Sequence, residues 1–311
     1  MLLILMSKII IGIHGLGNKP PPKTLGRWWQ AAIREGLERI EKPNPQFSFE
    51  LVYWAHYLYP LPLKPRIKDT ENPLYVDDPY ARAKEDAVVE PPSEFRQKIL
   101  DYLNEQLEKI FLNEDLTINY ALISDFIIHH FFSDLETYYH NYCVRRSQQD
   151  CRAKVAICTQ LANTLKKHRR KKILLIGHSM GSIIAYDVLR QYATKVHVDT
   201  LVTIGSPLGI PVIKSRLAAD CKNGTSQPGG LKTPDSIQSN WYNLSDLKDK
   251  IAFDYTLNDD FEENAAHIRP VDRIVSNDYE FGGIKNPHKS YGYLRTLEMA
   301  EIIDDFLNHK E

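Results

Sequence analysis

The hydrophobic residues of this 311-residue chain form short unbroken runs near the N-terminus and again after residue 170. Lys8–Ile13 is rich in isoleucine, which is typical of a strand covered on both faces. Between this run and the next, 25–40 has a helical period with Thr24 as its expected cap. Strand, helix and strand in this order predict a parallel sheet. The further predicted strands are 46–55, 173–177, 198–209 (with a loop), 240–245 and 270–277.

Residues 56–150 interrupt this rhythm, because they contain no clear strand and begin with a proline-rich stretch. We therefore predict a core formed by 1–55 and 151–311, with 56–150 as a largely helical insertion that could serve as a cap or lid. The helices expected in the insertion are 93–112, capped by Ser93, and 119–142. The helices expected around the core are 143–167, 181–192 and 290–308. Residues 222–236, rich in glycine and proline, are expected to form a surface segment.

Composition narrows the possible classes of protein but does not identify a function. The chain is 43% hydrophobic with a formal net charge of −1, so no overall field attracts nucleic acid. The apolar N-terminal run is too short to span a bilayer and lacks the features of a signal peptide. The chain has four cysteines, and Cys143, Cys151 and Cys158 share one helical face without a metal-binding spacing. We expect a cytoplasmic protein with no bound metal.

The basic run at 166–172 ends a predicted helix. Cations suit a helix C-terminus, so a solvated helix end is the favoured interpretation. Binding of phosphate or of a membrane surface is the alternative.

The stretch Gly-His-Ser-Met-Gly at 177–181 is the strongest candidate for chemistry. It directly follows an apolar run and directly precedes a helical pattern. A sharp turn from strand to helix exposes the serine side chain, and the flanking glycines leave room for that turn. The helix N-terminus then offers free N–H groups to a developing negative charge. A phosphate-binding or purely structural turn is the alternative interpretation of Ser179.

Five stretches in this order resemble the α/β-hydrolase superfamily, and within it lipases and esterases with a compact core. They are IIIGIHGLGN, LLIGHSMGSIIA, LVTIGSPLG, WYNLSDLKDKIA and NPHKSYGYL. Together they cover most of the chain outside 56–150. The resemblance implies an α/β fold in which a mostly parallel central sheet is flanked by helices, with the helical insertion added to it.

The resemblance also implies a triad in the order serine, acid, histidine. Ser179 would be the nucleophile and His288 the base, because His288 follows the strand predicted at 270–277 and precedes the last helix. His267 precedes that strand, and His309 lies near the end of the sequence. Asp249 is favoured as the acid, since Asp-Lys-Ile-Ala resembles the acid-bearing step of many lipases.

Asp246 is the runner-up acid, because a lysine follows Asp249 where family members often have proline. The oxyanion hole would consist of the N–H groups of Met180 and Leu16. The remaining expected site residues, in contact with substrate, are His14, Gly15 and His178. His14 is expected to orient this loop or to pack beneath it, and a core histidine with satisfied hydrogen bonds is favoured equally with any direct role.

These residues predict a hydrolase of carboxylic esters that forms an acyl-enzyme and needs no cofactor. Its substrate would be a small-molecule or lipid ester. The aromatic stretch 120–142 would either form an acyl pocket or a lid that contacts a membrane peripherally, or pack as a helical hairpin against the core. A binding module without catalysis, and an acyltransferase or thioesterase with the same triad, are the alternatives. The sequence does not indicate the oligomeric state.

Overall fold

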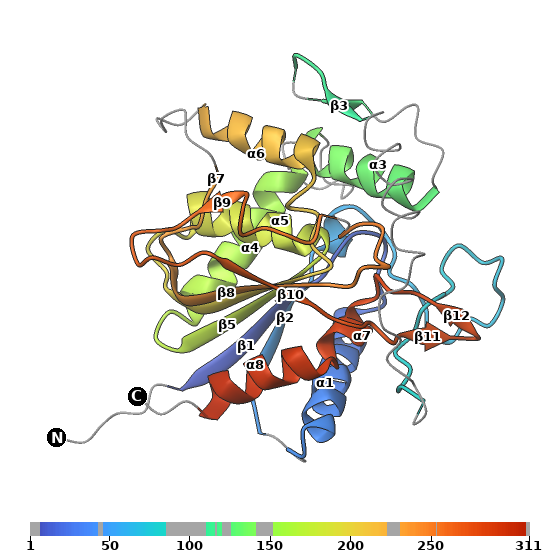
Figure 1. Ribbon diagram of the computed structural model, residues 1–311. Coiled ribbons are helices and arrows are strands. Elements are labelled where there is room, and N and C mark those ends of the chain that lie inside the picture. The colour runs from blue at the N-terminus through green and yellow to red at the C-terminus, as the bar shows by residue number, and fades with distance from the viewer. Residues whose placement is uncertain are drawn as a thin grey trace.

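A six-stranded, entirely parallel sheet forms the centre of the computed structural model, in the order β10-β8-β6-β5-β1-β2 (Figure 1). The strands are β1 (Lys8–Ile13), β2 (Phe49–Val52), β5 (Lys172–His178), β6 (Val198–Ile204), β8 (Ile237–Ser245) and β10 (Pro270–Ile274). The structure describes residues 7–42, 46–84, 110–115, 117–119, 126–140, 152–222, 231–252 and 254–308. The predicted fold class is confirmed: a parallel sheet flanked by helices.

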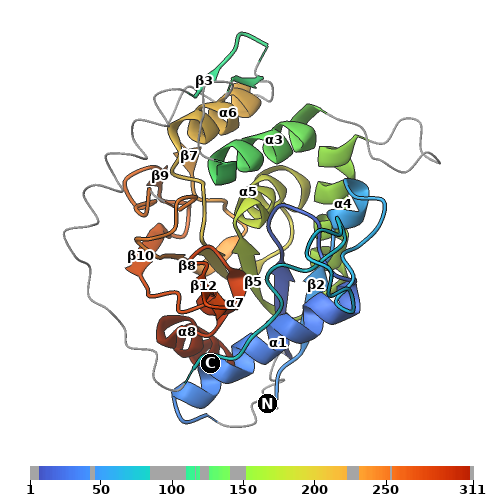
Figure 2. The same ribbon diagram turned by 90° about the vertical axis from the view of Figure 1, so that its right-hand side faces the viewer.

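Helices cover both faces of this sheet (Figures 1 and 2). One face carries α1 (Pro22–Arg39), α7 (Ser290–Leu294) and α8 (Leu297–Asn308). The other carries α4 (Ala153–Lys167) and α5 (Met180–Asp187), with α3 (Phe126–His140) and α6 (Pro211–Lys222) beyond them. Successive strand residues alternate between the faces, so Ile10 joins the first core while Ile9 and Ile11 join the second. Burial on both faces explains the unbroken apolar runs of β1 and β5.

Among the described residues, three short strand pairs lie outside the main sheet. β3 (Phe111–Leu112) pairs antiparallel with β4 (Ile118–Asn119), and β11 (Glu280–Phe281) with β12 (Ile284–Lys285). β7 (Leu231–Lys232) pairs in parallel with β9 (Phe261–Glu262). The β3–β4 pair shows that 56–150 contains strands, contrary to expectation. It also shows that the helix predicted at 93–112 does not include residues 111 and 112. The rest of that helix, and 223–230 of the expected surface segment, lie outside the described residues.

Helix α1 begins earlier than predicted, and Thr24 lies inside it. Pro22 occupies the first helical position and Pro21 precedes it, with no side-chain cap. Proline is suited to this position, because its fixed φ matches the helix and its missing N–H would have no partner there. The expectation that Thr24 caps the helix was therefore wrong.

Strand β2 is shorter at both ends than the predicted 46–55, since it begins at Phe49 and ends at Val52. Beyond its end, Trp54 is held by His14. The Trp54 N–H donates to His14 Nε2 at 3.1 Å, and its indole N–H donates to the His14 carbonyl at 2.8 Å. A short 3₁₀ turn, Ala55–Tyr57, follows. Local sequence propensity predicts a strand up to residue 55, whereas the long-range contact between Trp54 and His14 accompanies an earlier end.

The predicted helix 290–308 is divided into α7 and α8 at Arg295. This side chain is fully buried and donates to Asp278 Oδ1 and to the Ala81 carbonyl, each at 2.6 Å. Its charge is matched by Asp278 and by Glu35 of α1. A buried arginine needs such partners, and the break between the helices places its side chain among them.

Helix α3 falls within the predicted helix 119–142 and packs against α4. Its Phe131, Phe132 and Tyr138 are buried in the same core as that face of the sheet. The Tyr138 hydroxyl lies 3.2 Å from Cys158 Sγ of α4, and this cysteine is a buried free thiol. These three side chains favour packing against the core over a lipid-facing surface. No helix in the described part of the chain could cross a membrane.

Two glycines of α1 provide a matched test of this packing. A Cβ at Gly36 would lie 2.9 Å from Arg295 Cα, whereas one at Gly26 would meet only Leu51 Cβ at 3.9 Å. Gly36→Ala should lower the free energy of unfolding by about 1–3 kcal/mol through overpacking. Gly26→Ala should raise it by about 0.5–1 kcal/mol through helix propensity. Urea unfolding of both variants checks this, and equal effects would contradict the described α1–α7 contact.

Candidate active site

Ser179 occupies the turn between β5 and α5. Its backbone has φ 53° and ψ −126°, a positive φ that non-glycine residues rarely adopt. Its N–H donates to the Ile204 carbonyl at 3.0 Å, which holds the turn against β6. A Cβ at Gly181 would collide with the Ile13 carbonyl, and one at Gly177 would lie 2.9 Å from Ser182 Cα. Both glycines are therefore required by the close approach of strand and helix.

Three predicted residues form a hydrogen-bonded line. Ser179 Oγ lies 3.0 Å from His288 Nε2, and His288 Nδ1 lies 2.8 Å from Asp249 Oδ2. The carboxylate can only accept, so Nδ1 carries a proton and Nε2 is left to accept from the serine hydroxyl. Asp249 is fully buried, and the imidazole of His288 is about a quarter exposed.

The Asp249 carboxylate has partners besides the histidine. Tyr293 of α7 donates its hydroxyl to Oδ2 at 2.7 Å, and the Ile251 N–H donates to Oδ1 at 2.9 Å. Burial, and then the nearby charge of Asp249, raise the pKa of Tyr293 well above its ordinary value, so it remains a donor. Sequence reasoning missed Tyr293. The only sequence feature that could have pointed to Tyr293 is its position five residues after His288, in the stretch NPHKSYGYL.

Asp246 is held away from the histidine. Its carboxylate accepts from the backbone N–H of Lys248 at 2.7 Å and of Asn277 at 2.6 Å. Burial raises the pKa of Asp246 above its usual range, and the two N–H donors act against that rise. The structure thus brings Asp249 to His288 and uses Asp246 to cap a turn.

His178 supports the loop that carries His288. Its Nε2 lies 2.8 Å from the His288 carbonyl, which can only accept, so His178 donates from Nε2. Burial, followed by the proximity of His288, lowers the pKa of His178 well below its ordinary value. His178 is therefore a neutral side chain that ties the residue before the serine to the histidine backbone.

His14 is buried beneath the loop that follows β1. Its Nδ1 donates to the Gly15 carbonyl at 2.8 Å, while Nε2 accepts from the Trp54 N–H. The ring stacks on Trp54 at 4.7 Å, and burial lowers the pKa of His14 well below its ordinary value. Both nitrogens are engaged by backbone, which favours a loop support over contact with substrate. Gly15 passes so close to the serine that an added Cβ would lie 2.7 Å from Ser179 Cβ.

These contacts orient two successive peptide units of the loop. The C=O and N–H of a trans peptide point in opposite directions, so the bond from His14 to the Gly15 carbonyl turns the Leu16 N–H away from His14. In the next unit, Lys19 Nζ donates to the Leu16 carbonyl, and the Gly17 N–H donates to Asp134 Oδ2 at 3.1 Å. The Gly17 N–H is thereby occupied.

Two helices each contribute one further residue to the candidate site: α3 contributes Asp134 and α5 contributes Met180. Asp134 belongs to α3 and also accepts from the Tyr59 hydroxyl at 3.0 Å. Sequence reasoning missed it, because a polar residue on an aromatic helix has no local signal of a partner 117 positions away. Met180 is the first residue of α5, where an N–H has no partner within the helix.

Comparisons with known proteins bear on the fold. Residues 114–220 match the model of a family described as the PGAP1-like alpha/beta domain. The match includes α4, β5, the Ser179 turn and β6, spans the predicted boundary at residue 150, and ends before Asp249 and His288. No curated protein matches the chain. No cluster of three or more potential metal ligands occurs among the described residues.

Asp134→Ala should loosen the loop after β1, because the Gly17 N–H loses its acceptor. We expect hydrogen–deuterium exchange of a peptide covering 14–19 to accelerate several-fold. Glu136→Ala is the matched control, since Glu136 lies on the same helix with the same charge but accepts from Ile118 N–H. Equal exchange in the two variants would show that Asp134 does not hold the loop.

Proposed function

We propose that this chain is a serine hydrolase of the α/β-hydrolase superfamily that cleaves carboxylic esters. The observation that carries the proposal is the hydrogen-bonded line from Ser179 Oγ through His288 to Asp249. A serine hydroxyl is a weak nucleophile near neutral pH and needs an adjacent base. An imidazole that accepts from the hydroxyl on one nitrogen and donates to a buried carboxylate from the other provides one.

In the first step, Ser179 Oγ attacks the ester carbonyl carbon while His288 Nε2 takes the hydroxyl proton. The new C–O bond moves the carbonyl electron pair onto oxygen, and Asp249 stabilises the imidazolium that forms. The N–H groups of Met180 and Leu16 would bind the resulting oxyanion. Met180 is suited to this as the first residue of a helix, and Leu16 because the His14–Gly15 bond directs its N–H.

The tetrahedral intermediate then collapses to an acyl-enzyme. The bond to the leaving alkoxide breaks, and the imidazolium of His288 protonates that oxygen, which releases an alcohol. A water molecule repeats the sequence with His288 as base, and Ser179 leaves from the second intermediate. The products are a carboxylic acid and an alcohol, and no cofactor takes part.

The contacts that hold the histidine loop fit the proposed role of His288 as the base. The His288 backbone is tied to His178, and its ring to Asp249, so little reorientation is needed for proton transfer. Such preorganisation lowers the barrier, because the groups are aligned before the substrate binds.

Covalent labelling tests the nucleophile. A neutral fluorophosphonate probe should label the native protein once, and Ser179→Ala should abolish labelling while the fold, measured by circular dichroism, is kept. Ser182→Ala is the control, because Ser182 is also buried next to the turn but donates its hydroxyl to the Ser179 carbonyl. A folded native protein that does not label, or a Ser179→Ala variant that still labels, would exclude the mechanism.

The two aspartates provide a second test with matched variants. Asp249→Asn should lower kcat on a 4-nitrophenyl ester by roughly 10³–10⁴-fold, because the imidazolium loses its counter-charge and the ring its tautomer. Asp246→Asn should lower it less than about tenfold, since its partners are backbone N–H groups and an amide oxygen can replace one acceptor. The opposite ranking would transfer the role of acid to Asp246.

A further inference from the structure

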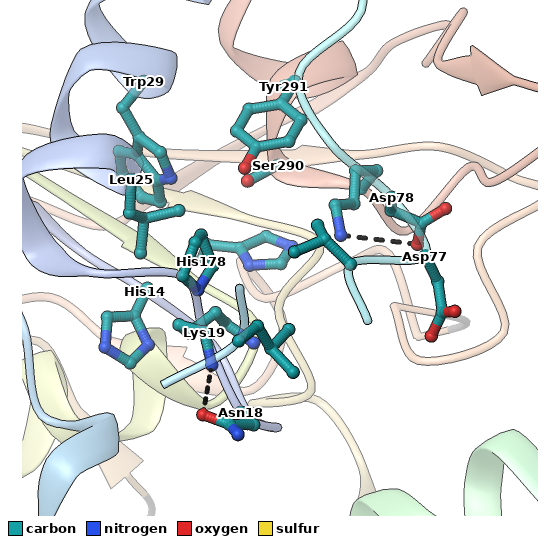
Figure 3. Close-up of a pocket in the computed structure, with 14 residues that line it drawn as sticks. His14, Asn18, Lys19, Leu25, Trp29, Asp77, Asp78, His178, Ser290 and Tyr291 are labelled. Carbon is teal, nitrogen blue, oxygen red and sulfur yellow. Dashed lines mark hydrogen bonds and ion pairs between the residues drawn. The ribbon is translucent and has the colours of Figure 1, made fainter. Parts of the chain in front are cut away.

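A small cavity of about 150 Å³ adjoins the candidate site (Figure 3). Its walls come from the loop after β1, from α1, from the segment around Asp78, and from the residues next to the proposed serine and histidine. His178 precedes Ser179 and Lys289 follows His288 in the chain, and both line the cavity. A group bound there would thus contact residues that directly adjoin both reacting residues in the chain.

Donors converge on this cavity from three elements. Lys19 comes from the loop after β1 and Trp29 from α1, as Figure 3 shows, and Lys289 of the histidine loop also lines the cavity. Trp29 is fully buried, and its Nε1 has no hydrogen-bond partner among the described residues. Figure 3 shows this nitrogen on the side of the indole that faces the other lining residues. A buried N–H without an acceptor is costly, so the arrangement favours an acceptor from outside the chain.

Two lysines and two aspartates, Asp77 and Asp78, line the cavity, and the lysines differ in how closely a carboxylate approaches them. Lys289 Nζ lies 3.3 Å from Asp78 Oδ2, which also accepts from the Asn286 side chain at 2.9 Å, and the charge of Asp77 acts on Lys289 as well. Lys19 Nζ donates to the backbone carbonyls of Leu16 and Gly17, which are neutral. Burial, and then the charge of Lys289, lower the pKa of Lys19 to about 7. Because the charge of Lys289 acts on Lys19, an anion between the two ammonium groups would offset their repulsion.

We propose that this cavity binds an anionic group, a phosphate or a carboxylate, carried by the ester substrate. The assignment to substrate rests on the proposed function, whereas binding of the anion does not. Lys19, Lys289 and the Trp29 indole would each donate to an oxygen of the group. Because Lys19 also holds the Leu16 carbonyl, an anion that orders Lys19 would stabilise the loop bearing the proposed oxyanion donor.

Calorimetric titration with inorganic phosphate tests the cavity without requiring turnover. The Ser179→Ala protein is used, alone and combined with Lys289→Met or Lys285→Met. Methionine keeps the apolar stem and removes the charge. Lys285 is an exposed lysine four residues earlier, which controls for the change in net charge. Loss of Lys289 should weaken binding by about tenfold or more, as expected for a charge-assisted hydrogen bond, and loss of Lys285 should leave it unchanged.

Titration with acetate distinguishes carboxylate from phosphate as the preferred group.

The pH dependence of sulfate binding tests the role of the lysines. The charge of sulfate is constant between pH 6 and 9, so a change in its affinity over this range follows the protonation of the protein. Below pH about 7 Lys19 is protonated, so affinity should be highest there and fall as pH rises. The charges facing Lys19 are those of Lys289, Asp134 and Asp78, and Asp77 also lines the cavity; burial lowers the pKa of Lys289 as well. No binding of any of these anions at tens of millimolar, or equal affinity in the two lysine variants, would overturn the proposal.

Matched esters test whether the anion belongs to the substrate. The ratio of kcat/KM for 4-nitrophenyl hemisuccinate to that for 4-nitrophenyl butyrate compares a carboxylate with a methyl group on the same chain length. We expect Lys289→Met to lower this ratio by about tenfold and Lys285→Met to leave it unchanged. An unchanged ratio in both would overturn the assignment to substrate. If neither ester reacted, the proposed function would fail, and the calorimetric result would still decide the anion site.

Discussion

The geometry of the site depends on one carboxylate that is removed from water. Asp249 is 1% exposed, and a charge in that environment is stable only when donors surround it. The ring of His288, the hydroxyl of Tyr293 and the N–H groups of Ile251 and Ala252 supply them. These donors belong to the loop after β8, the histidine loop and α7. The buried carboxylate and the three segments therefore depend on one another, and this network orients His288.

The loop after β1 is constrained in a comparable way, but by more distant parts of the chain. Trp54 fixes His14, His14 fixes the Gly15 carbonyl, and Asp134 accepts from Gly17. Through Asp134, a helix of the predicted insertion supports a loop of the core. Lys19 connects this loop to the neighbouring cavity. An anion bound in the cavity, as proposed, would therefore act on this loop through one side chain.

Most of the fold could be predicted because its signals are local. The buried strands β1, β5 and β6 are unbroken apolar runs, and alternation of their side chains between two helical layers requires no long-range information. The errors occurred where a distant partner prevailed over local propensity. Strand β2 ends before Trp54, which bonds to His14, and buried Arg295 divided the last helix to reach Asp278. The division of the chain into a core and an insertion remains a prediction.

The sequence by itself determined the turn at Ser179, because a glycine-framed serine between a strand and a helix is a local pattern with few structural solutions. Chain order then pointed to His288 and to two acids three residues apart. Only the tertiary structure separated Asp249 from Asp246, since both follow β8 and differ only in which donors they meet. Likewise, sequence reasoning did not identify roles for Tyr293, Asp134, Lys19 and Lys289. Their roles arise from contacts between segments tens to hundreds of residues apart, which no local pattern encodes.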